Sequence, residues 1–249
     1  MPNILILGGT TEASALAQAL ATRGDRATLS YAGRVAQPKA QPVPTRIGGF
    51  GGAAGLADYL RAGSVTHLVD ATHPFAARMS ANAVEAAARA GIPLIALTRR
   101  AWTAQPGDAW RHVDDLAAAV ATLAGPRRTV MLALGRMHVA AFAVQPQHRY
   151  LLRFVDVPEV APDLPDHHLV VDRGPFDVTK DVALMRDHAV EIVVCKNAGG
   201  TGAQAKLVAA RRLGIPVVMI DRPVLPLRVE VDAVADVLRW IDHAADRGV

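Results

Sequence analysis

The chain has 249 residues, of which 51% are hydrophobic and 20% are charged, and its formal net charge is +4. A chain of this length forms one large domain or two of ordinary size, and its apolar content is ample for a packed core. The basic residues are scattered, without the stripe or module typical of nucleic-acid binders, so an acidic small molecule is the better inference for a ligand. No apolar run reaches the roughly 18 residues of a membrane span, and no basic leader precedes an apolar segment, so neither membrane insertion nor secretion is expected.

Strands and helices alternate along the first half, which predicts a parallel sheet covered on both faces. The predicted strands are Ile4–Leu7, Ala27–Ser30, Thr45–Ile47, His67–Asp70 and Leu94–Leu97. The predicted helices are Thr11–Arg23, Ala53–Ala62 and Ala76–Ala90. Gly24, Gly63 and Gly91 each follow a helix, where a left-handed residue is expected.

The alternation restarts after a connection near Trp102–Asp108. The predicted strands are Thr129–Leu134, Tyr150–Val157, His168–Val171, Ile192–Cys195 and Val217–Ile220. The predicted helices are Asp114–Leu123, Met137–Phe142, Lys180–His188, Ala203–Leu213 and Val231–His243. We therefore expect an α/β fold of two Rossmann-like domains, residues 1–100 and 101–249, with mostly parallel sheets and a cleft between them.

The most informative motif is GGTTEA, residues 8–13, which joins a buried strand to a helix. In an α/β chain such a turn is where a nucleotide diphosphate binds, because glycines admit the ligand and the helix N-terminus favours an anion. The motif departs from the usual GxGxxG pattern, so a purely structural turn is the alternative. Glu12 has to point away from a phosphate and would serve the helix dipole instead.

Two further polar insertions follow predicted strands: DATHPFA, residues 70–76, and KNAGGTG, residues 196–202. Ligands of open α/β sheets bind at this end of the strands. His73 is either an acid or base or a cap that orients its loop, and Asp70 either accepts from a ligand hydroxyl or caps a turn. Lys196 and Asn197 are interpreted as functional because the glycines beside them leave backbone N–H groups open.

The glycines of this third insertion, Gly199, Gly200 and Gly202, have an alternative interpretation as merely flexible positions. Cys195 immediately precedes the insertion and lies in an apolar strand, which favours a core thiol over a nucleophile. Because it is the single cysteine, no internal disulfide can form, and this suits a reducing cytoplasm.

The end of the second predicted strand indicates the type of cofactor. It has no Asp or Glu for a ribose 2′-hydroxyl, whereas Ser30 and Arg34 suit a 2′-phosphate, so NADP is favoured over NAD. A solvated surface arginine is the alternative for Arg34. A glycine cluster at residues 48–52 opens the next helix and is a candidate border of the cofactor.

Metal and serine-nucleophile chemistry find little support. The chain has nine histidines but no HExxH or CxxC motif, and the adjacent pair His167-His168 would diverge on a strand. No GxSxG elbow occurs.

Taken together, the segments ILILGGTTEA, SYAGR, DATHPFA and CKNAGGTGAQAK, with the later Asp221-Arg222-Pro223, closely resemble the precorrin-6A reductases of cobalamin biosynthesis and the related cobalt-precorrin-6A reductases. The resemblance runs essentially end to end, and DATHPFA with KNAGG is its specific part. It implies a two-domain Rossmann-type enzyme that uses NADPH to reduce one carbon–carbon double bond of a ring-contracted corrinoid precursor. The acetate and propionate side chains of that substrate imply dispersed cationic partners.

The site residues that we predict fall into three sets. The cofactor-binding candidates are Gly8, Gly9, Thr10, Thr11, Ser30, Gly33, Arg34, Ala71, Thr72 and His73. The substrate-binding candidates are Arg136, Lys196, Asn197, Gly200 and Thr201, with Arg99, Arg100, Arg153, Arg173 and Lys180 as further carboxylate partners. His73 and Lys196 are the candidate proton donors, and solvent water competes for that role.

No metal, nucleic-acid or membrane partner is expected, and the protein is expected to be a cytoplasmic monomer. Two rival functions remain at this stage, a two-domain Rossmann-like transferase and a non-catalytic dinucleotide sensor. Comparable affinity for NADP and NAD would favour the transferase. Binding without NADPH consumption would favour the sensor.

Overall fold

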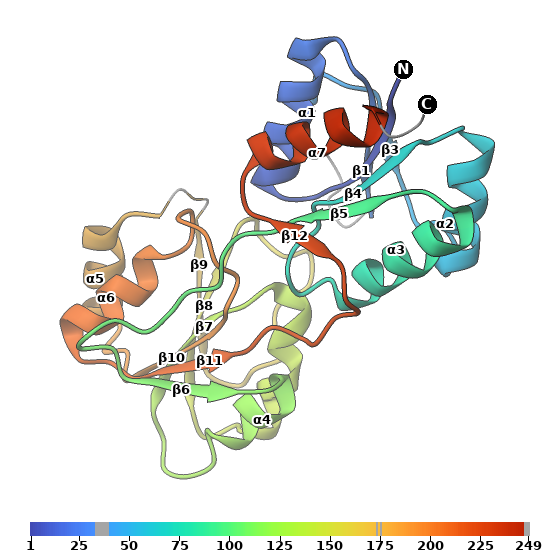
Figure 1. Cartoon of the computed structure of the whole chain (residues 1–249). Helices are drawn as coiled ribbons and strands as arrows, with labels where there is room; N and C mark the ends of the chain where they lie inside the picture. Colours follow the sequence, from blue (N-terminus) through green and yellow to red (C-terminus); the bar gives the residue numbers. More distant parts are fainter. Residues whose placement is uncertain (33–39, 173, 175, 247–249) are drawn as a thin grey trace. The chain divides into compact units, whose positions relative to one another are not determined.

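The computed structural model describes residues 1–32, 40–172, 174 and 176–246 (Figure 1). The chain divides into two compact units, unit 1 being Met1–Arg99 with Val224–Val249 and unit 2 being Arg100–Pro223. Each unit contains a six-stranded sheet whose recorded strand pairs are all parallel. The predicted α/β fold with two parallel-sheet domains is confirmed, and the expected cleft between them stays a prediction.

Unit 1 has the strand order β12-β5-β4-β1-β2-β3. Its strands are β1 (Asn3–Leu7), β2 (Arg26–Tyr31), β3 (Thr45–Ile47), β4 (His67–Asp70), β5 (Leu94–Leu97) and β12 (Val229–Val231). Its helices are α1 (Thr11–Arg23), α2 (Gly52–Ala62), α3 (Ala77–Ala90) and α7 (Val234–Asp246).

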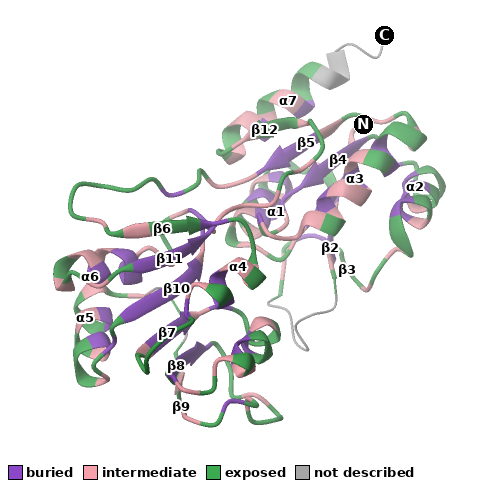
Figure 2. Cartoon of the chain, turned by 90° about the horizontal axis from the view of Figure 1, so that it is seen from below, coloured by how far each residue is buried: buried purple, intermediate pink, exposed green. Residues whose placement is uncertain are grey.

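The two faces of this sheet are covered by different helix pairs, because the side chains of a strand alternate between faces. Ile4 and Ile6 of β1 pack with α1 and α7, whereas Leu5 and Leu7 pack with α2 and α3. Figure 1 shows these pairs on opposite sides of the sheet, and Figure 2 shows its central strands buried. Such two-sided burial is why the buried part of β1, Ile4–Leu7, is a continuous apolar run.

The C-terminal segment belongs to unit 1, contrary to the predicted second domain of residues 101–249. Val229 of β12 pairs with Ile95 of β5, and Asp242 of α7 forms an ion pair with Arg23 of α1, with a distance of 2.6 Å between Nη2 and Oδ1. The predicted helix Val231–His243 also begins too early, because Val231 ends the short strand and α7 begins at Val234.

Unit 2 has the strand order β6-β11-β10-β7-β8-β9. Its strands are β6 (Trp110–Val113), β7 (Thr129–Ala133), β8 (Arg149–Phe154), β9 (His167–Val171), β10 (Ile192–Lys196) and β11 (Val217–Ile220). Its helices are α4 (Leu116–Ala121), the 3-10 helix η1 (Arg136–Val144), α5 (Val178–Asp187) and α6 (Ala205–Leu213).

Several predicted features of the two units differ from the structure. β6 was not predicted, and the strand expected to reach Val157 ends at Phe154. Gly24 and Gly91 adopt the left-handed conformation as expected, whereas Gly63 is right-handed and Ser64 takes the positive φ, 47°.

Cys195 belongs to the core of unit 2. Its side chain is fully buried beside Met219, 3.8 Å from Sγ to Sδ, and burial raises the pKa of the thiol. A protonated, inaccessible thiol is a poor nucleophile, so the structure agrees with a core role. None of the helices in the described part of the chain combines the length and apolar character that crossing a membrane requires.

Candidate functional site

The GGTTEA turn is held tightly against the sheet of unit 1. Gly8 donates its N–H to the carbonyl of Ser30 at 2.9 Å. A Cβ added to Gly8 would lie 2.4 Å from Cδ1 of Leu29 and 3.3 Å from Cβ of Ala13, so glycine is what allows α1 to approach β2. Gly9 has a φ of 119°, and a Cβ there would meet nothing within 4 Å. The backbone at Gly9 is therefore open to a ligand.

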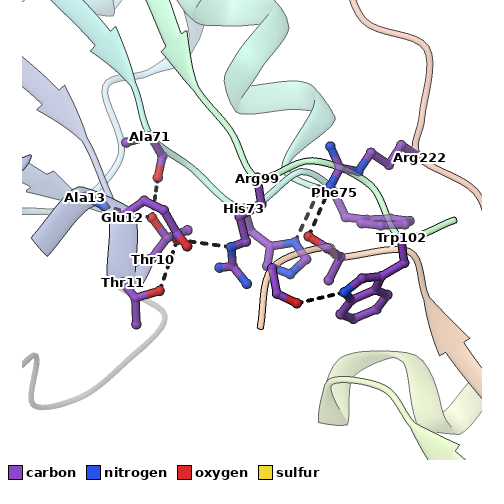
Figure 3. Close-up of polar contacts among 12 residues, drawn as sticks. Thr10, Thr11, Glu12, Ala13, Ala71, His73, Phe75, Arg99, Trp102 and Arg222 are labelled. Atoms are coloured by element: carbon purple, nitrogen blue, oxygen red, sulfur yellow. Dashed lines mark hydrogen bonds and ion pairs between the residues drawn. The ribbon is translucent and has the colours of Figure 1, made fainter. Parts of the chain in front are cut away.

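Thr10 connects this turn to the DATHPFA loop. Its hydroxyl accepts the N–H of Ala13 at 3.1 Å, which caps α1, and donates to the carbonyl of Ala71 at 2.7 Å (Figure 3). The first backbone N–H groups of a helix have no partner within the helix, and their dipoles favour an anion. The two predicted loops thus form one surface at the carboxyl edge of the sheet.

Glu12 forms an ion pair at the start of α1. Its Oε2 accepts from Nε of Arg99 at 3.0 Å and from the hydroxyl of Thr11 at 3.0 Å (Figure 3). The pairing neutralises the carboxylate that made this motif unusual for a phosphate site. Arg99 was predicted as a partner for substrate carboxylates. In the structure it pairs with Glu12 at the N-terminus of α1, where the sequence predicts that a diphosphate binds.

Asp70 is an internal anchor of the DATHPFA loop. Its Oδ1 accepts from the N–H and hydroxyl of Thr72, at 3.1 and 2.7 Å, and its Oδ2 is paired with Arg228. The side chains of Asp70 and Arg228 are 1% and 5% exposed. Of the two interpretations of Asp70, the structure thus favours the turn cap over contact with a ligand. Arg228 was missed because only strand β12 brings it here.

His73 helps to orient the same loop. Its Nδ1 accepts the N–H of Phe75 at 3.2 Å, and the side chain is exposed. In the neutral imidazole this places the proton on Nε2. The structure therefore agrees with the interpretation that His73 caps its loop, and a role for His73 as an acid or base stays a prediction.

The end of β2 carries an arginine contact that sequence reasoning missed. The buried hydroxyl of Ser30 accepts from Nη1 of Arg46 on β3 at 3.1 Å. Gly33 and Arg34 lie outside the described residues, so the prediction that Arg34 binds a 2′-phosphate is carried forward as it stands.

The corresponding edge of unit 2 carries basic side chains. Lys196 ends β10, and its Nζ lies 2.7 Å from Nε2 of His138 on η1. A lysine ammonium can only donate, so Nε2 accepts and the imidazole proton is on Nδ1. Exposed Arg136 begins η1 just after β7, the neighbour of β10. The structure thus brings Lys196 and Arg136 to adjacent strand ends. The sequence analysis did not name His138 as a site residue. Its position just after the predicted strand Thr129–Leu134 would have indicated that it lies at the carboxyl edge of the sheet.

Asn197 clamps the backbone rather than pointing to a ligand. Its Oδ1 accepts the N–H of Trp102 at 2.8 Å and its Nδ2 donates to the carbonyl of Trp102 at 3.0 Å, in a buried position. The indole N–H of Trp102 in turn donates to the carbonyl of Gly200 at 2.7 Å. The amide that sequence reasoning assigned to substrate is thereby used within unit 2.

The glycine turn after β10 is constrained, not merely flexible. Gly199 has a φ of 72°, and a Cβ there would lie 2.2 Å from the carbonyl oxygen of Arg100. The side chain of Lys206, on α6, is buried against Trp102, with Nζ 4.8 Å from the centre of the Trp102 ring. Burial lowers the pKa of the Lys206 ammonium. Thr201, a predicted substrate contact, is exposed beside this turn.

The remaining predicted cations lie in different environments. Arg153 forms a buried ion pair with Asp181, which withdraws it from a role in substrate binding. Arg100 and Lys180 are exposed, and Arg173 lies outside the described residues. Within the described ranges no group of three or more His, Cys, Asp or Glu side chains is arranged to hold a metal ion.

These features define the class of protein. It is a two-unit Rossmann-like protein with a glycine turn at the carboxyl edge of the sheet in unit 1 and basic side chains at the carboxyl edge of the sheet in unit 2. A family model described as precorrin-6x reductase CbiJ/CobK matches residues 3–242. The chain belongs to this family, which confirms the resemblance found in the sequence.

Named relatives agree along the whole chain. Precorrin-6A reductase of Rhodobacter capsulatus is 56% identical, and the match covers 100% of both chains. Precorrin-6A reductase of Rhodococcus erythropolis is 50% identical, and the match covers 97% of this chain and 98% of the relative. Cobalt-precorrin-6A reductase of Priestia megaterium is 30% identical, with 97% of each chain covered. A solved structure named CobK precorrin-6A reductase superposes with a TM-score of 0.92 at 55% identity, covering 100% of each chain.

Proposed function

We propose that this protein reduces one ring double bond of precorrin-6A, with NADPH as the reductant, in cobalamin biosynthesis. The observation that carries the proposal is the hydrogen bond from Thr10 to Ala71, which joins the GGTTEA turn and the family-specific DATHPFA loop into one surface. This surface lies at the carboxyl edge of a parallel sheet, where Rossmann-type folds bind dinucleotides. Membership of the precorrin-6x reductase family supports the choice of substrate.

The residues of unit 1 fit a dinucleotide. The diphosphate would lie at the N-terminus of α1, against the open backbone of Gly9 and beside the guanidinium of Arg99. Ser30 and Arg34 would hold the 2′-phosphate, and His73 with Thr72 would border the nicotinamide end. When bound, the nicotinamide of NADPH supplies a hydride to the electron-poor ring system.

The basic edge of unit 2 suits an anionic, tetrapyrrole-derived substrate. Lys196 and Arg136 would pair with its carboxylates, and the contact with His138 holds the Lys196 ammonium in place. The reduction also requires a proton at the neighbouring ring carbon. His73 and Lys196 are the candidate donors, because each carries an N–H group at the carboxyl edge of its sheet.

The test is an anaerobic assay that follows NADPH absorbance after precorrin-6A is added to the full-length protein. We expect one NADPH to be consumed for each substrate molecule, and a much slower reaction with NADH. A stable NADPH signal in the presence of substrate, with cofactor binding intact, would instead support a dinucleotide sensor. Equal binding of NADP and NAD would favour the transferase.

A further inference from the structure

Arg46 lies one strand outside the position where a Rossmann fold usually reads the ribose. It faces Ser30 in the β2–β3 register, and Ser30 faces Leu7 in the β1–β2 register, one residue before Gly8. The glycine turn, Ser30 and Arg46 therefore lie in a row across three adjacent strands at the carboxyl edge of the sheet.

The guanidinium of Arg46 is held rigidly. Nη1 donates to Ser30 Oγ at 3.1 Å and to the carbonyl of Gly48 at 2.6 Å, and Nη2 donates to the carbonyl of Gly49 at 2.7 Å. Its Cζ lies over the Phe50 ring, 3.7 Å from the ring centre. A half-buried cation fixed in this way loses little further entropy when it binds an anion.

The positive charge of Arg46 has no carboxylate partner among the described residues. The sequence contains no Asp or Glu between Asp25 and Asp58, so β3 and its flanking segments offer none. The other arginines near this edge differ, since Arg99 pairs with Glu12 and Arg228 with Asp70.

Ser30 provides a second, independent observation. It is 3% exposed, and within the described part of the chain its hydroxyl accepts from Arg46 without donating to any acceptor. A serine hydroxyl has one donor in addition to its lone pairs, and a buried donor without an acceptor is costly. An anion that reached both groups would satisfy the hydroxyl donor and the guanidinium charge together.

We propose that Arg46, with Ser30, binds the 2′-phosphate of the adenosine ribose and thereby selects NADPH over NADH. The inference rests on the proposed function, because it assumes that the dinucleotide lies across the β1 turn and the end of β2. It adds a cation on β3 to Arg34, the residue expected from the sequence. Phosphate suits the site because its oxygens accept from a guanidinium and a hydroxyl at once.

The experiment compares 2′,5′-ADP with 5′-AMP, which differ only in the 2′-phosphate, by isothermal titration of the full-length protein. Wild type should bind 2′,5′-ADP at least tenfold more tightly. Arg46→Gln, which keeps a donor for the glycine carbonyls but removes the charge, should lower this preference by about 10- to 100-fold. Its affinity for 5′-AMP should change less than about threefold. Arg46→Lys, which keeps the charge, should retain part of the preference.

The matched control is Arg61→Gln, which removes the same charge from α2, where Arg61 pairs with Asp58 at 3.1 Å. It should leave the preference unchanged. Equal losses for both nucleotides in Arg46→Gln would make Arg46 a scaffold of the glycine loop and overturn the inference, as would a retained preference. A wild-type protein that binds both nucleotides equally and oxidises no NADPH would overturn the proposed function itself.

Discussion

The carboxyl edges of the two sheets carry different kinds of side chains and backbone groups. At the edge of unit 1, the carboxylates of Glu12 and Asp70 are each matched by an arginine, and a glycine turn leaves backbone available. At the edge of unit 2, Lys196 rests on His138 and the loop beside it is braced by Trp102. The carboxyl edge of unit 1 thus offers open backbone together with Arg46, whereas the carboxyl edge of unit 2 offers the side-chain cations Lys196 and Arg136. This difference is what the proposed division between a dinucleotide edge and a polycarboxylate edge rests on.

The largest effect should come from breaking the buried anchor of unit 1. Arg228→Met leaves Asp70 buried without its partner and should destabilise unit 1 by about 3–5 kcal/mol, as measured by urea unfolding. NADPH affinity should fall with it, because Asp70 orders Thr72. The control is Arg61→Met, whose exposed ion pair should contribute less than about 1 kcal/mol. Similar losses in the two variants would contradict the anchoring role.

The braced turn of unit 2 should be nearly as sensitive. Gly199→Ala places a methyl group against the carbonyl of Arg100 at a positive φ, which should cost about 2–4 kcal/mol of stability. Gly202→Ala is the matched control, because a Cβ there would meet nothing within 4 Å. If both substitutions were tolerated equally in thermal unfolding, the turn would be flexible after all.

The fold was largely predictable from the sequence, because strands buried on both faces are apolar runs separated by helix signals. Two of the four outermost strands, β6 and β12, were not predicted, whereas β3 and β9 were. Trp110–Val113 and Val229–Val231 are short and partly polar, and Val231 was mistaken for the start of the amphipathic helix behind it. That β12 returns to unit 1 depends on pairing with β5, which no local pattern encodes.

The candidate site was predictable as loops but not as individual contacts. The motifs correctly indicated which segments lie at the sheet edges. They could not distinguish a side chain that clamps backbone, such as Asn197, from one that meets a ligand. Arg46 was overlooked because its proximity to Ser30 arises only from the register of β2 with β3.

The division between cofactor and substrate edges can be tested at Lys196. Lys196→Ala should lower kcat/KM for precorrin-6A by about 10- to 100-fold, the effect of one lost charge-assisted contact, while the Kd for NADPH stays within about twofold. Arg127→Ala is the control and should be neutral, because this exposed cation of unit 2 lies before β7 and pairs with Asp166. A parallel loss of NADPH affinity in Lys196→Ala would break the proposed division.

An effect of similar size is expected at Arg34. Arg34→Ala should weaken NADPH binding by about 1–3 kcal/mol and leave NADH nearly unaffected, as titrations of both cofactors would measure. Equal losses for the two cofactors would mean that Arg34 does not contact the 2′-phosphate.

The most direct test of the whole account is a single turnover with precorrin-6A and NADPH that carries deuterium at both C4 positions of the nicotinamide. The account predicts a dihydro product with one deuterium from the cofactor and one hydrogen from solvent, as detected by mass spectrometry. A reduced product without deuterium, or no reduced product from an enzyme that binds NADPH, would contradict it.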